Sequence, residues 1–286
     1  MRKMGMPAAV LAALALAAAL AGCQLGMDST AESDDAKAIA AEIADPSSGL
    51  TQELDDISAY LFGEPAAKGQ IARFARFFTG NLASFAWNPD TGAYERTRTV
   101  FDLVLENRIV HIGRVFVQVM FYTSSDGTGS SFQPALGETL DPSVHSIRWH
   151  REVAGTSTHT VTGAVSGFTA QSDLRFSSID MTAGTVTVDG THSRTFTRTF
   201  ESGKTVDGTV SYALSGLQIT RDPVAGTLSW AGTLQYTYDA TVTRTNGTEV
   251  ERHRSGTVTF EGSSTFIVAS ADGSYRCSLV DGSLVR

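Results

Sequence analysis

Cysteine is scarce in this sequence, which has Cys23 and Cys277 and no others. Small exported domains without an adequate core are held together by several disulfides, and two cysteines cannot supply such a framework. Cys277 alternates in phase with Tyr275 and Leu279, which predicts a buried small apolar residue rather than a reactive thiol. The fold must therefore be stabilised by a hydrophobic core.

Short catalytic motifs are also missing. The sequence contains no His-Glu-x-x-His, Gly-x-Ser-x-Gly, Ser-x-x-Lys or P-loop pattern. His145 and His150 differ by an odd number, so on one strand they would point to opposite faces and could not share a metal ion. Asp55 and Asp56 lie near the start of a predicted helix, where carboxylates favour the helix dipole. No metal site and no cofactor is predicted, and the sequence does not indicate an enzyme; an uncharacterised hydrolase with a site assembled from distant strands stays an alternative.

Basic residues are fewer than acidic ones. The 22 Lys and Arg stand against 30 Asp and Glu, which gives a net charge of −8. A chain of this charge is repelled by the phosphate backbone of nucleic acids, so nucleic acid is excluded as a partner. The hydrophobic share of 42% is ordinary for a globular protein and excludes disorder throughout the chain.

The sequence lacks an apolar run of transmembrane length. The run from Ala8 to Leu20 is shorter than the about 20 residues that a membrane span needs. It follows Arg2 and Lys3 and ends in small residues, which is the pattern of a secretory signal. The sequence therefore predicts an exported protein.

The end of this run carries a more specific pattern. Leu20-Ala21-Gly22-Cys23 resembles the lipobox of bacterial lipoproteins, and the resemblance implies cleavage before Cys23 and attachment of lipid, palmitate included, to that cysteine. Gln24 follows, where lipoproteins retained in the inner membrane often have Asp, so the resemblance implies the outer membrane if the organism has two. Cleavage leaves 20 basic and 30 acidic residues, a net charge of −10. The predicted partner is a membrane, held through lipid on Cys23.

Composition divides the chain into four parts. Residues 1–22 are the lipoprotein signal peptide. Residues 23–50, which are rich in Ser, Asp and Ala, are predicted to form a lipidated flexible tether with no more than a transient helix in it. Residues 51–88 are predicted to be a helical segment that packs on a sheet, and residues 89–286 an antiparallel β domain.

Two helices are predicted in the helical segment. The first begins at Thr51, a capping residue, and ends at Gly63. Its apolar residues recur at helical spacing: Leu54, Ile57, Tyr60 and Leu61. The second runs from Ala66 to about Thr79 with an apolar stripe of Ile71, Phe74, Phe77 and Phe78. Such a stripe also occurs on membrane-surface helices, but the long sheet that follows favours packing on the sheet.

After Ala86 the hydrophobic period changes from helical spacing to 2, which is typical of strands. Two early strands are predicted around residues 101–105 and 115–121. The clearest strand runs from Thr227 to Arg244. Its apolar phase consists of Leu228, Trp230, Leu234, Tyr236, Tyr238, Ala240 and Val242. Because the opposite phase is rich in Thr, the pattern predicts an antiparallel sheet with one solvated face.

The sequence contains an internal echo, in which residues 183–191 resemble residues 225–233. The echo predicts two similar long hairpins, at about 183–221 and 225–268. Gly190 corresponds to Gly232, which has no turn residues beside it. Both glycines are therefore predicted to mark a bend or bulge within a strand rather than a turn.

The turns of the two hairpins follow from the rule that facing residues share a face. A three-residue loop over 246–248, with Gly247 at positive φ, satisfies this rule and pairs Tyr236 with Val258. The same rule places the other loop at 201–205. A slip of two residues would preserve the faces and stays open.

The length of the strands decides the fold class. A strand of about 17 residues spans roughly 55 Å, whereas a helix of about 14 residues spans only ~21 Å. One helix cannot cover that apolar face. We therefore predict a mainly β fold, with a long-stranded antiparallel sheet curled into a sandwich, half-barrel or barrel and a small N-terminal helical segment. A transmembrane barrel is disfavoured because Arg194, Arg198 and Arg252 lie on the phase that would meet lipid, where an arginine costs about 2–4 kcal/mol at the bilayer midplane.

The apolar phase of the hairpins supplies a candidate ligand site. The predicted contact residues are Trp230, Tyr236, Tyr238, Phe260, Arg194 and Arg252. If the hairpins stack in register, their basic residues form a mouth that suits an anionic head group. Alternatively, acidic residues pair with these arginines across the strands: Glu201, Asp207, Glu249 and Glu251. An architecture of this kind resembles that of bacterial lipoprotein carriers that hold acyl chains in a half-barrel.

These observations predict a membrane-anchored cell-envelope lipoprotein with a non-catalytic, β-rich binding or structural domain. One alternative is a carrier of an apolar or lipid-like ligand in a sheet groove with a basic mouth. Another is an adhesion or assembly module that meets a second envelope protein. An enclosed apolar cavity would favour the carrier, and a flat exposed apolar patch would favour assembly.

Overall fold

The structure is a computed structural model that describes residues 29–45, 48–62, 85–105, 108–134, 140–222, 227–262, 264–271, 273–279 and 282–285. The chain divides into an N-terminal unit that ends at Asp35 and a compact body from Ala36 to Arg286. The predicted signal peptide, Cys23, Gln24 and the predicted helix from Ala66 to Thr79 lie outside the described residues.

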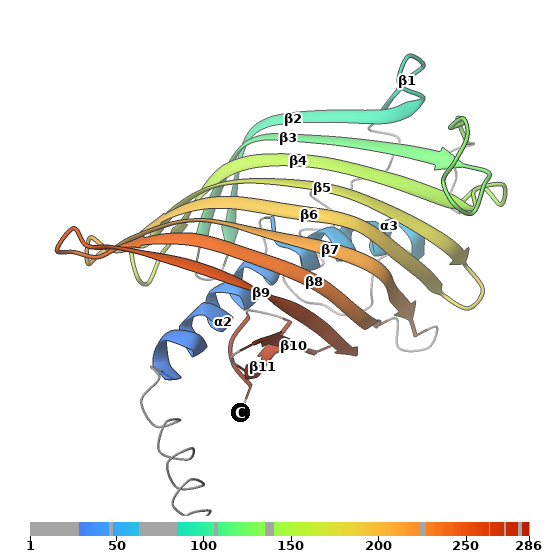
Figure 1. Cartoon of the computed structure of the whole chain (residues 1–286). Helices are drawn as coiled ribbons and strands as arrows, with labels where there is room; N and C mark the ends of the chain where they lie inside the picture. Colours follow the sequence, from blue (N-terminus) through green and yellow to red (C-terminus); the bar gives the residue numbers. More distant parts are fainter. Residues whose placement is uncertain are drawn as a thin grey trace, which may run out of the picture. The chain divides into compact units, whose positions relative to one another are not determined.

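One antiparallel sheet of eleven strands forms most of the body, and each strand pairs with the next along the chain. The sheet curves strongly and remains open, with β1 and β11 as its two edges (Figure 1). Its strands are β1 (Ala86–Asn88), β2 (Ala93–Leu105), β3 (Arg108–Tyr122), β4 (Ser146–His159), β5 (Val165–Asp180), β6 (Thr185–Thr199), β7 (Thr205–Arg221), β8 (Leu228–Thr243), β9 (Glu249–Gly262), β10 (Thr265–Ser270) and β11 (Gly273–Ser278). The predicted mainly β fold class is confirmed. Of the predicted sandwich, half-barrel and barrel, the sheet matches the half-barrel, because it does not close on itself.

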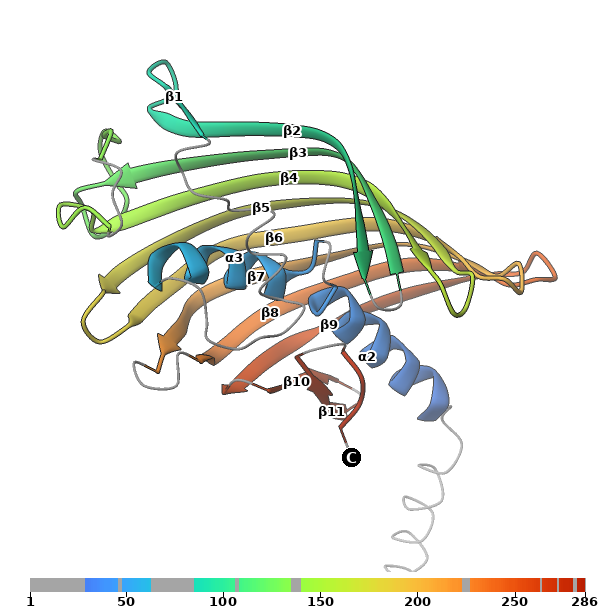
Figure 2. The same ribbon diagram turned by 180° about the vertical axis from the view of Figure 1, so that it is seen from behind.

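Two described helices, α2 (Ser29–Ile43) and α3 (Leu50–Phe62), precede the sheet. From Ala36 onwards they lie on its concave side (Figure 2). The predicted helix from Thr51 to Gly63 is α3, whose residues Leu50, Leu54 and Ile57 are fully buried. Within the described ranges, neither helix combines the length and the apolarity that a membrane span requires.

The prediction of a tether over residues 23–50 is wrong for residues 36–45 and 48–50, which belong to the packed body. Ile39 and Ile43 stand on the same face of α2 and are at most 1% exposed. These two large apolar residues, one helical turn apart, form the apolar stripe of α2 that packs on the sheet. The composition of the segment, which is rich in Ala, hid that stripe.

The core lies between the concave face of the sheet and the two helices. On β8 the alternation is as predicted, with Trp230, Leu234 and Tyr236 buried and the intervening Thr233 and Gln235 exposed. Cys277 is fully buried in the same core. Burial raises the pKa of its thiol to about 11, so the thiolate that reacts with oxidants is hardly populated at neutral pH.

The turn between β8 and β9 differs from its prediction by two residues. Thr243 faces Glu249, and Tyr236 faces Gly256 rather than Val258. In a three-residue bulged hairpin the left-handed residue is the last of the three loop residues. Gly247, with φ of +80°, therefore ends the loop and places it at 245–247.

The turn between β6 and β7 repeats this design. Phe196 faces Gly208, and the backbone N–H groups of Phe200 and Gly203 bond to the carbonyls of Lys204 and Phe200. The loop is 201–203 rather than the predicted 201–205, again with its glycine last. Both registers slipped by two residues, which kept the buried and solvated faces as predicted.

The glycines of the echo lie inside strands, as predicted. Gly190 belongs to β6 and Gly232 to β8, with φ of +130° and +135°. The β6–β7 register shifts at Val188 and Gly190, and the β7–β8 register shifts between Leu214 and Gln218. These irregularities bend the strands locally.

Candidate functional site

Five of the six predicted contact residues lie buried on the concave side of the sheet. Trp230 contacts Phe260 edge to face, with 5.4 Å between ring centroids. Tyr236 and Tyr238 follow on β8, and each is 2% exposed. Arg194 is buried on β6. The sixth residue, Arg252, stands apart near the β8–β9 turn, opposite Ala240.

Arg194 is paired with residues from α2 and the turn after it. Its guanidinium contacts the carboxylate of Glu42, and Nη2 lies 3.4 Å from Oδ2 of Asp45. Its Nε donates a hydrogen bond to Oγ of Ser48 at 2.7 Å. The predicted cross-strand partners are wrong for this arginine, because the carboxylates come from a helix on the concave face and not from neighbouring strands.

Arg198, two residues along β6, shares the same carboxylate. Its Nη2 donates to Oε1 of Glu42 at 2.7 Å, and its Nε donates to Oγ of Ser166 at 3.1 Å. Glu42 itself is 1% exposed. Two arginines on one strand therefore bind a single buried carboxylate and fix the C-terminal turn of α2 over β6.

A second buried ion pair fixes α3, and the sequence analysis did not identify it. Glu53 contacts the guanidinium of Arg151 on β4, and both side chains are fully buried. The same carboxylate accepts a hydrogen bond from Nε1 of Trp149 at 3.0 Å. A carboxylate with two such donors is held in one orientation.

A signal for these pairs was present in the sequence. Arg151 and Arg194 each fall on the apolar phase of a strand, where an arginine needs a carboxylate from whatever covers that face. Glu42 adjoins Ile43 on α2, and Glu53 adjoins Leu54 on α3. Acidic residues on the apolar face of a helix were therefore the candidates for that partner.

The low-polarity interior changes the titration of the groups beside these pairs. Burial, with a further contribution from Arg198, lowers the pKa of Arg194 to about 9. Burial also lowers the pKa of His192 to about 4, opposed in part by the nearby Glu53. His192 is held neutral between Oγ of Ser172, 2.9 Å from Nδ1, and the ring of Tyr212, which stacks on it.

The buried His192 makes stability depend on pH. In the unfolded chain the imidazole binds a proton below its ordinary pKa of 6.5, whereas in the folded chain it stays neutral down to about pH 4. Stability that is present above pH 6.5 is therefore lost as the pH falls towards 4, by up to about 3 kcal/mol. We expect His192→Asn to reduce this loss, measured by urea unfolding at several pH values. His145→Asn, at an exposed position just before β4, should leave the loss unchanged, and an equal loss in both variants would contradict the assignment.

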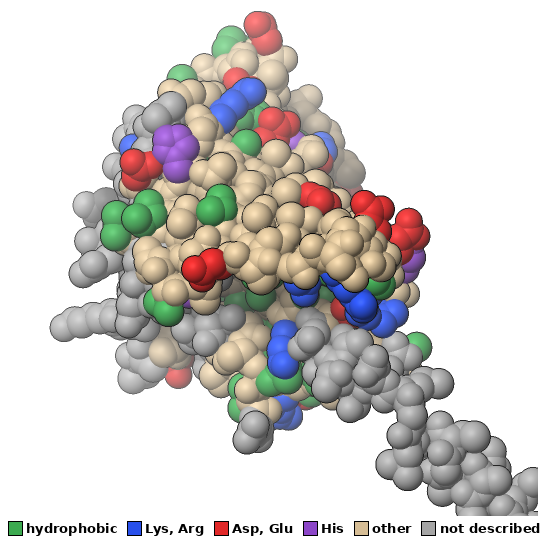
Figure 3. Space-filling view, turned by 90° about the vertical axis from the view of Figure 1, so that its left-hand side faces the viewer, with side chains coloured by type: hydrophobic (Ala, Val, Ile, Leu, Met, Phe, Trp, Pro, Cys, Tyr) green, Lys and Arg blue, Asp and Glu red, His purple; other side chains and the backbone are tan. Residues whose placement is uncertain are grey.

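The predicted basic mouth is a surface of mixed charge. The strand turns β2–β3, β4–β5, β6–β7 and β8–β9 share one end of the sheet, where Lys and Arg side chains gather beside Asp and Glu (Figure 3). Lys204 and Arg244 are exposed there, and so are Glu201, Glu249 and Glu251. Opposite charges so close together largely cancel the attraction for an anionic head group.

The buried charged groups of the concave face are paired with one another. Among the described residues, no group of three or more His, Cys, Asp or Glu is placed to hold a metal ion. The buried arginines are neutralised by helix carboxylates, and within the described ranges the side-chain hydrogen bond of His192 is to the hydroxyl of Ser172. The defined feature is an apolar, aromatic concave face that two helices cover through buried ion pairs.

No protein-family model, no curated protein sequence and no solved structure matches this chain.

Proposed function

We propose that the chain is a membrane-anchored cell-envelope lipoprotein whose β body is a non-catalytic binding or structural module. The observation that carries the anchor is the run Leu20-Ala21-Gly22-Cys23 at the end of an apolar segment. Lipid on Cys23 attaches the protein to the outer membrane where two membranes are present. Several acyl chains together make such attachment effectively stable.

Metabolic labelling with an alkyne analogue of palmitate tests the anchor. The wild-type protein should carry the label and partition with the membrane fraction. Cys23→Ser should carry none, because no other residue takes the thioether. Cys277→Ser is the matched control and should label like the wild type, since Cys277 is buried. Label that persists in Cys23→Ser would contradict the proposal.

A second candidate function is the carriage of an apolar or lipid-like ligand on the concave face. The concentration of large aromatic side chains there favours it, namely Trp230, Tyr236, Tyr238 and Phe260. Aromatic surface of this kind binds apolar ligands mainly through burial of surface. Because α2 and α3 cover the described part of this face, a ligand has to lie against the helices or take the place of one of them.

The buried ion pairs restrict which ligands could displace α2 or α3 from the concave face. A ligand that displaces α2 or α3 separates Glu42 from Arg194 or Glu53 from Arg151, and a buried arginine without its carboxylate is costly. An amphiphile with an anionic head meets this condition, since its head can take the position of the carboxylate. An adhesion or assembly module has no such requirement.

A further inference from the structure

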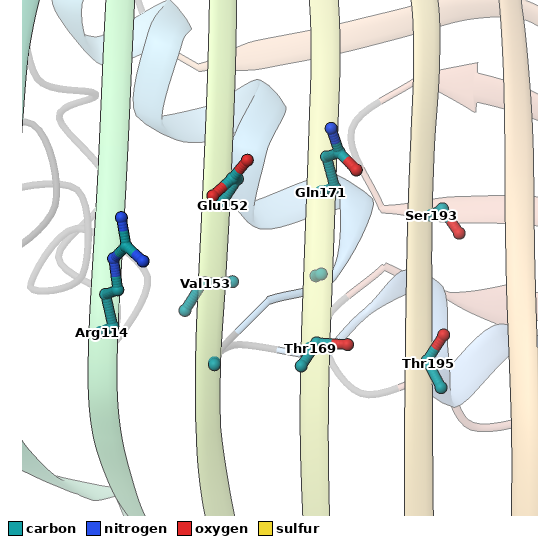
Figure 4. A pocket seen from close by; sticks show the side chains of 9 residues that line it. Arg114, Glu152, Val153, Thr169, Gln171, Ser193 and Thr195 are labelled. Atoms are coloured by element: carbon teal, nitrogen blue, oxygen red, sulfur yellow. The ribbon is translucent and has the colours of Figure 1, made fainter.

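A hollow on the convex face of the sheet is separate from the helices and from the concave site. It has a volume of about 310 Å³ and lies across strands β3 to β6 (Figure 4). Ligand pockets start at about this size. The outward-pointing side chains around it are Arg114, Glu152, Thr169, Gln171, Ser193 and Thr195.

The register of the strands explains the shape of the hollow. Arg114, Ala154, Thr169 and Thr195 follow one another across the sheet as direct partners. Glu152, Gln171 and Ser193 form the neighbouring row. The rows are two residues apart, roughly 6.6 Å, and Ala154 contributes only a methyl group to its row. The result is a groove that runs across the strands, floored by the backbone of Val153 and Ala170, whose side chains are buried in the concave core.

The polar groups of the groove are available to a ligand. Among the described residues, the side chains of Arg114 and Gln171 make no hydrogen bond and no ion pair. Glu152 has only a long contact to His150, at 3.4 Å. The hydroxyls of Ser193 and Thr195 bond sideways to Ser211 and Thr209 on β7, which fixes their positions and leaves each with further bonding capacity.

The charges of the groove select against an ionic ligand. An anion that reaches Arg114 also meets the carboxylate of Glu152, and a cation that reaches Glu152 meets the guanidinium of Arg114. A neutral ligand with many groups that both donate and accept hydrogen bonds matches all of the lining side chains at once. Phe116 lies beside Glu152 in the same row and adds a flat apolar surface.

The length of the groove selects among such ligands. It crosses three interstrand spacings, roughly 14 Å, which exceeds a single sugar ring. Sugar rings present hydroxyls at their edges, which the polar rows match, and apolar C–H groups on their faces, which Phe116 at the side of the groove matches. We propose that this convex groove is a binding site for a neutral oligosaccharide, which lies across strands β3 to β6.

Titration of the full chain in mild detergent with chitotetraose, the tetramer of N-acetylglucosamine, tests the proposal by isothermal calorimetry or by ligand-observed NMR. We expect binding with a dissociation constant of about 1 mM or tighter, because the site is exposed and preformed. Cellotetraose separates recognition of the acetamido group from recognition of the sugar chain. Binding of either tetramer supports the proposal, and failure of both overturns it.

Two variants locate the binding. Gln171→Ala should weaken it at least tenfold, whereas Gln235→Ala, the same change on the convex side of β8, should not alter it. Ala154→Leu fills the groove and should abolish binding even if the amide contributes little. Thermal unfolding confirms that each variant is folded. Sugar binding that survives both Gln171→Ala and Ala154→Leu would contradict the assignment of the groove.

Discussion

Glu53→Ala is expected to lower the free energy of unfolding by about 3–5 kcal/mol. The substitution removes the carboxylate from a fully buried Arg151 and takes the acceptor from Nε1 of Trp149. A buried arginine without its partner retains its whole desolvation cost, which is why the loss exceeds the net value of the pair. Urea unfolding followed by circular dichroism measures the change.

Two further variants make the result specific. Glu261→Ala breaks the exposed pair with Arg276, 3.0 Å apart, and should cost less than about 1 kcal/mol. Replacement of both buried partners, Glu53→Leu with Arg151→Met, should recover the part of the stability that the unpaired charge removes, although Nε1 of Trp149 still lacks its acceptor. A loss for Glu53→Ala no larger than that for Glu261→Ala would contradict the role given to the pair.

Gly190→Ala is expected to cost about 3 kcal/mol, from a strained backbone and from overpacking together. Gly190 has φ of +130°, and a β carbon there would lie 2.2 Å from the carbonyl oxygen of Asp173. The matched control is Gly167→Ala on β5, where φ is not in the left-handed region and no atom lies within 4 Å of the added carbon. Chemical denaturation of both variants gives the comparison, and equal stabilities would contradict the assignment of Gly190 to a strained bend.

Much of the sheet could be predicted because its information is local. Alternation along β8 assigns Trp230 and Tyr236 to the buried face without knowledge of the partner strands. The echo of Gly190 in Gly232 identified both as bends because a turn needs turn residues at both copies. The predicted buried and solvated faces are correct despite the error in register, since a slip of two residues changes the cross-strand partners but not the face on which each side chain lies.

The helix contacts could not be predicted in the same way. Which helix covers which strand is a long-range property, and Glu42 reaches Arg194 across a large separation in the chain. The turn at 245–247 was misplaced because several three-residue loops satisfy the face rule, and only the position of Gly247 within the loop decides among them. The helical residues 36–43 were assigned to a tether because their two isoleucines are a weak signal among alanines.

The convex groove could not be predicted from the sequence either. Gln171 and Arg114 are ordinary exposed residues in the sequence, and only the pairing of four strands brings them to one hollow. No spacing along the chain indicates such a site.

Native mass spectrometry of the full chain, extracted from the membrane in a mild detergent, tests most directly whether the β body is a binding module for apolar ligands. The carrier function predicts a native mass that exceeds the denatured mass by at least one amphiphile, which is released when the fold is lost. Native and denatured masses that coincide would contradict carriage of an amphiphile on the concave face.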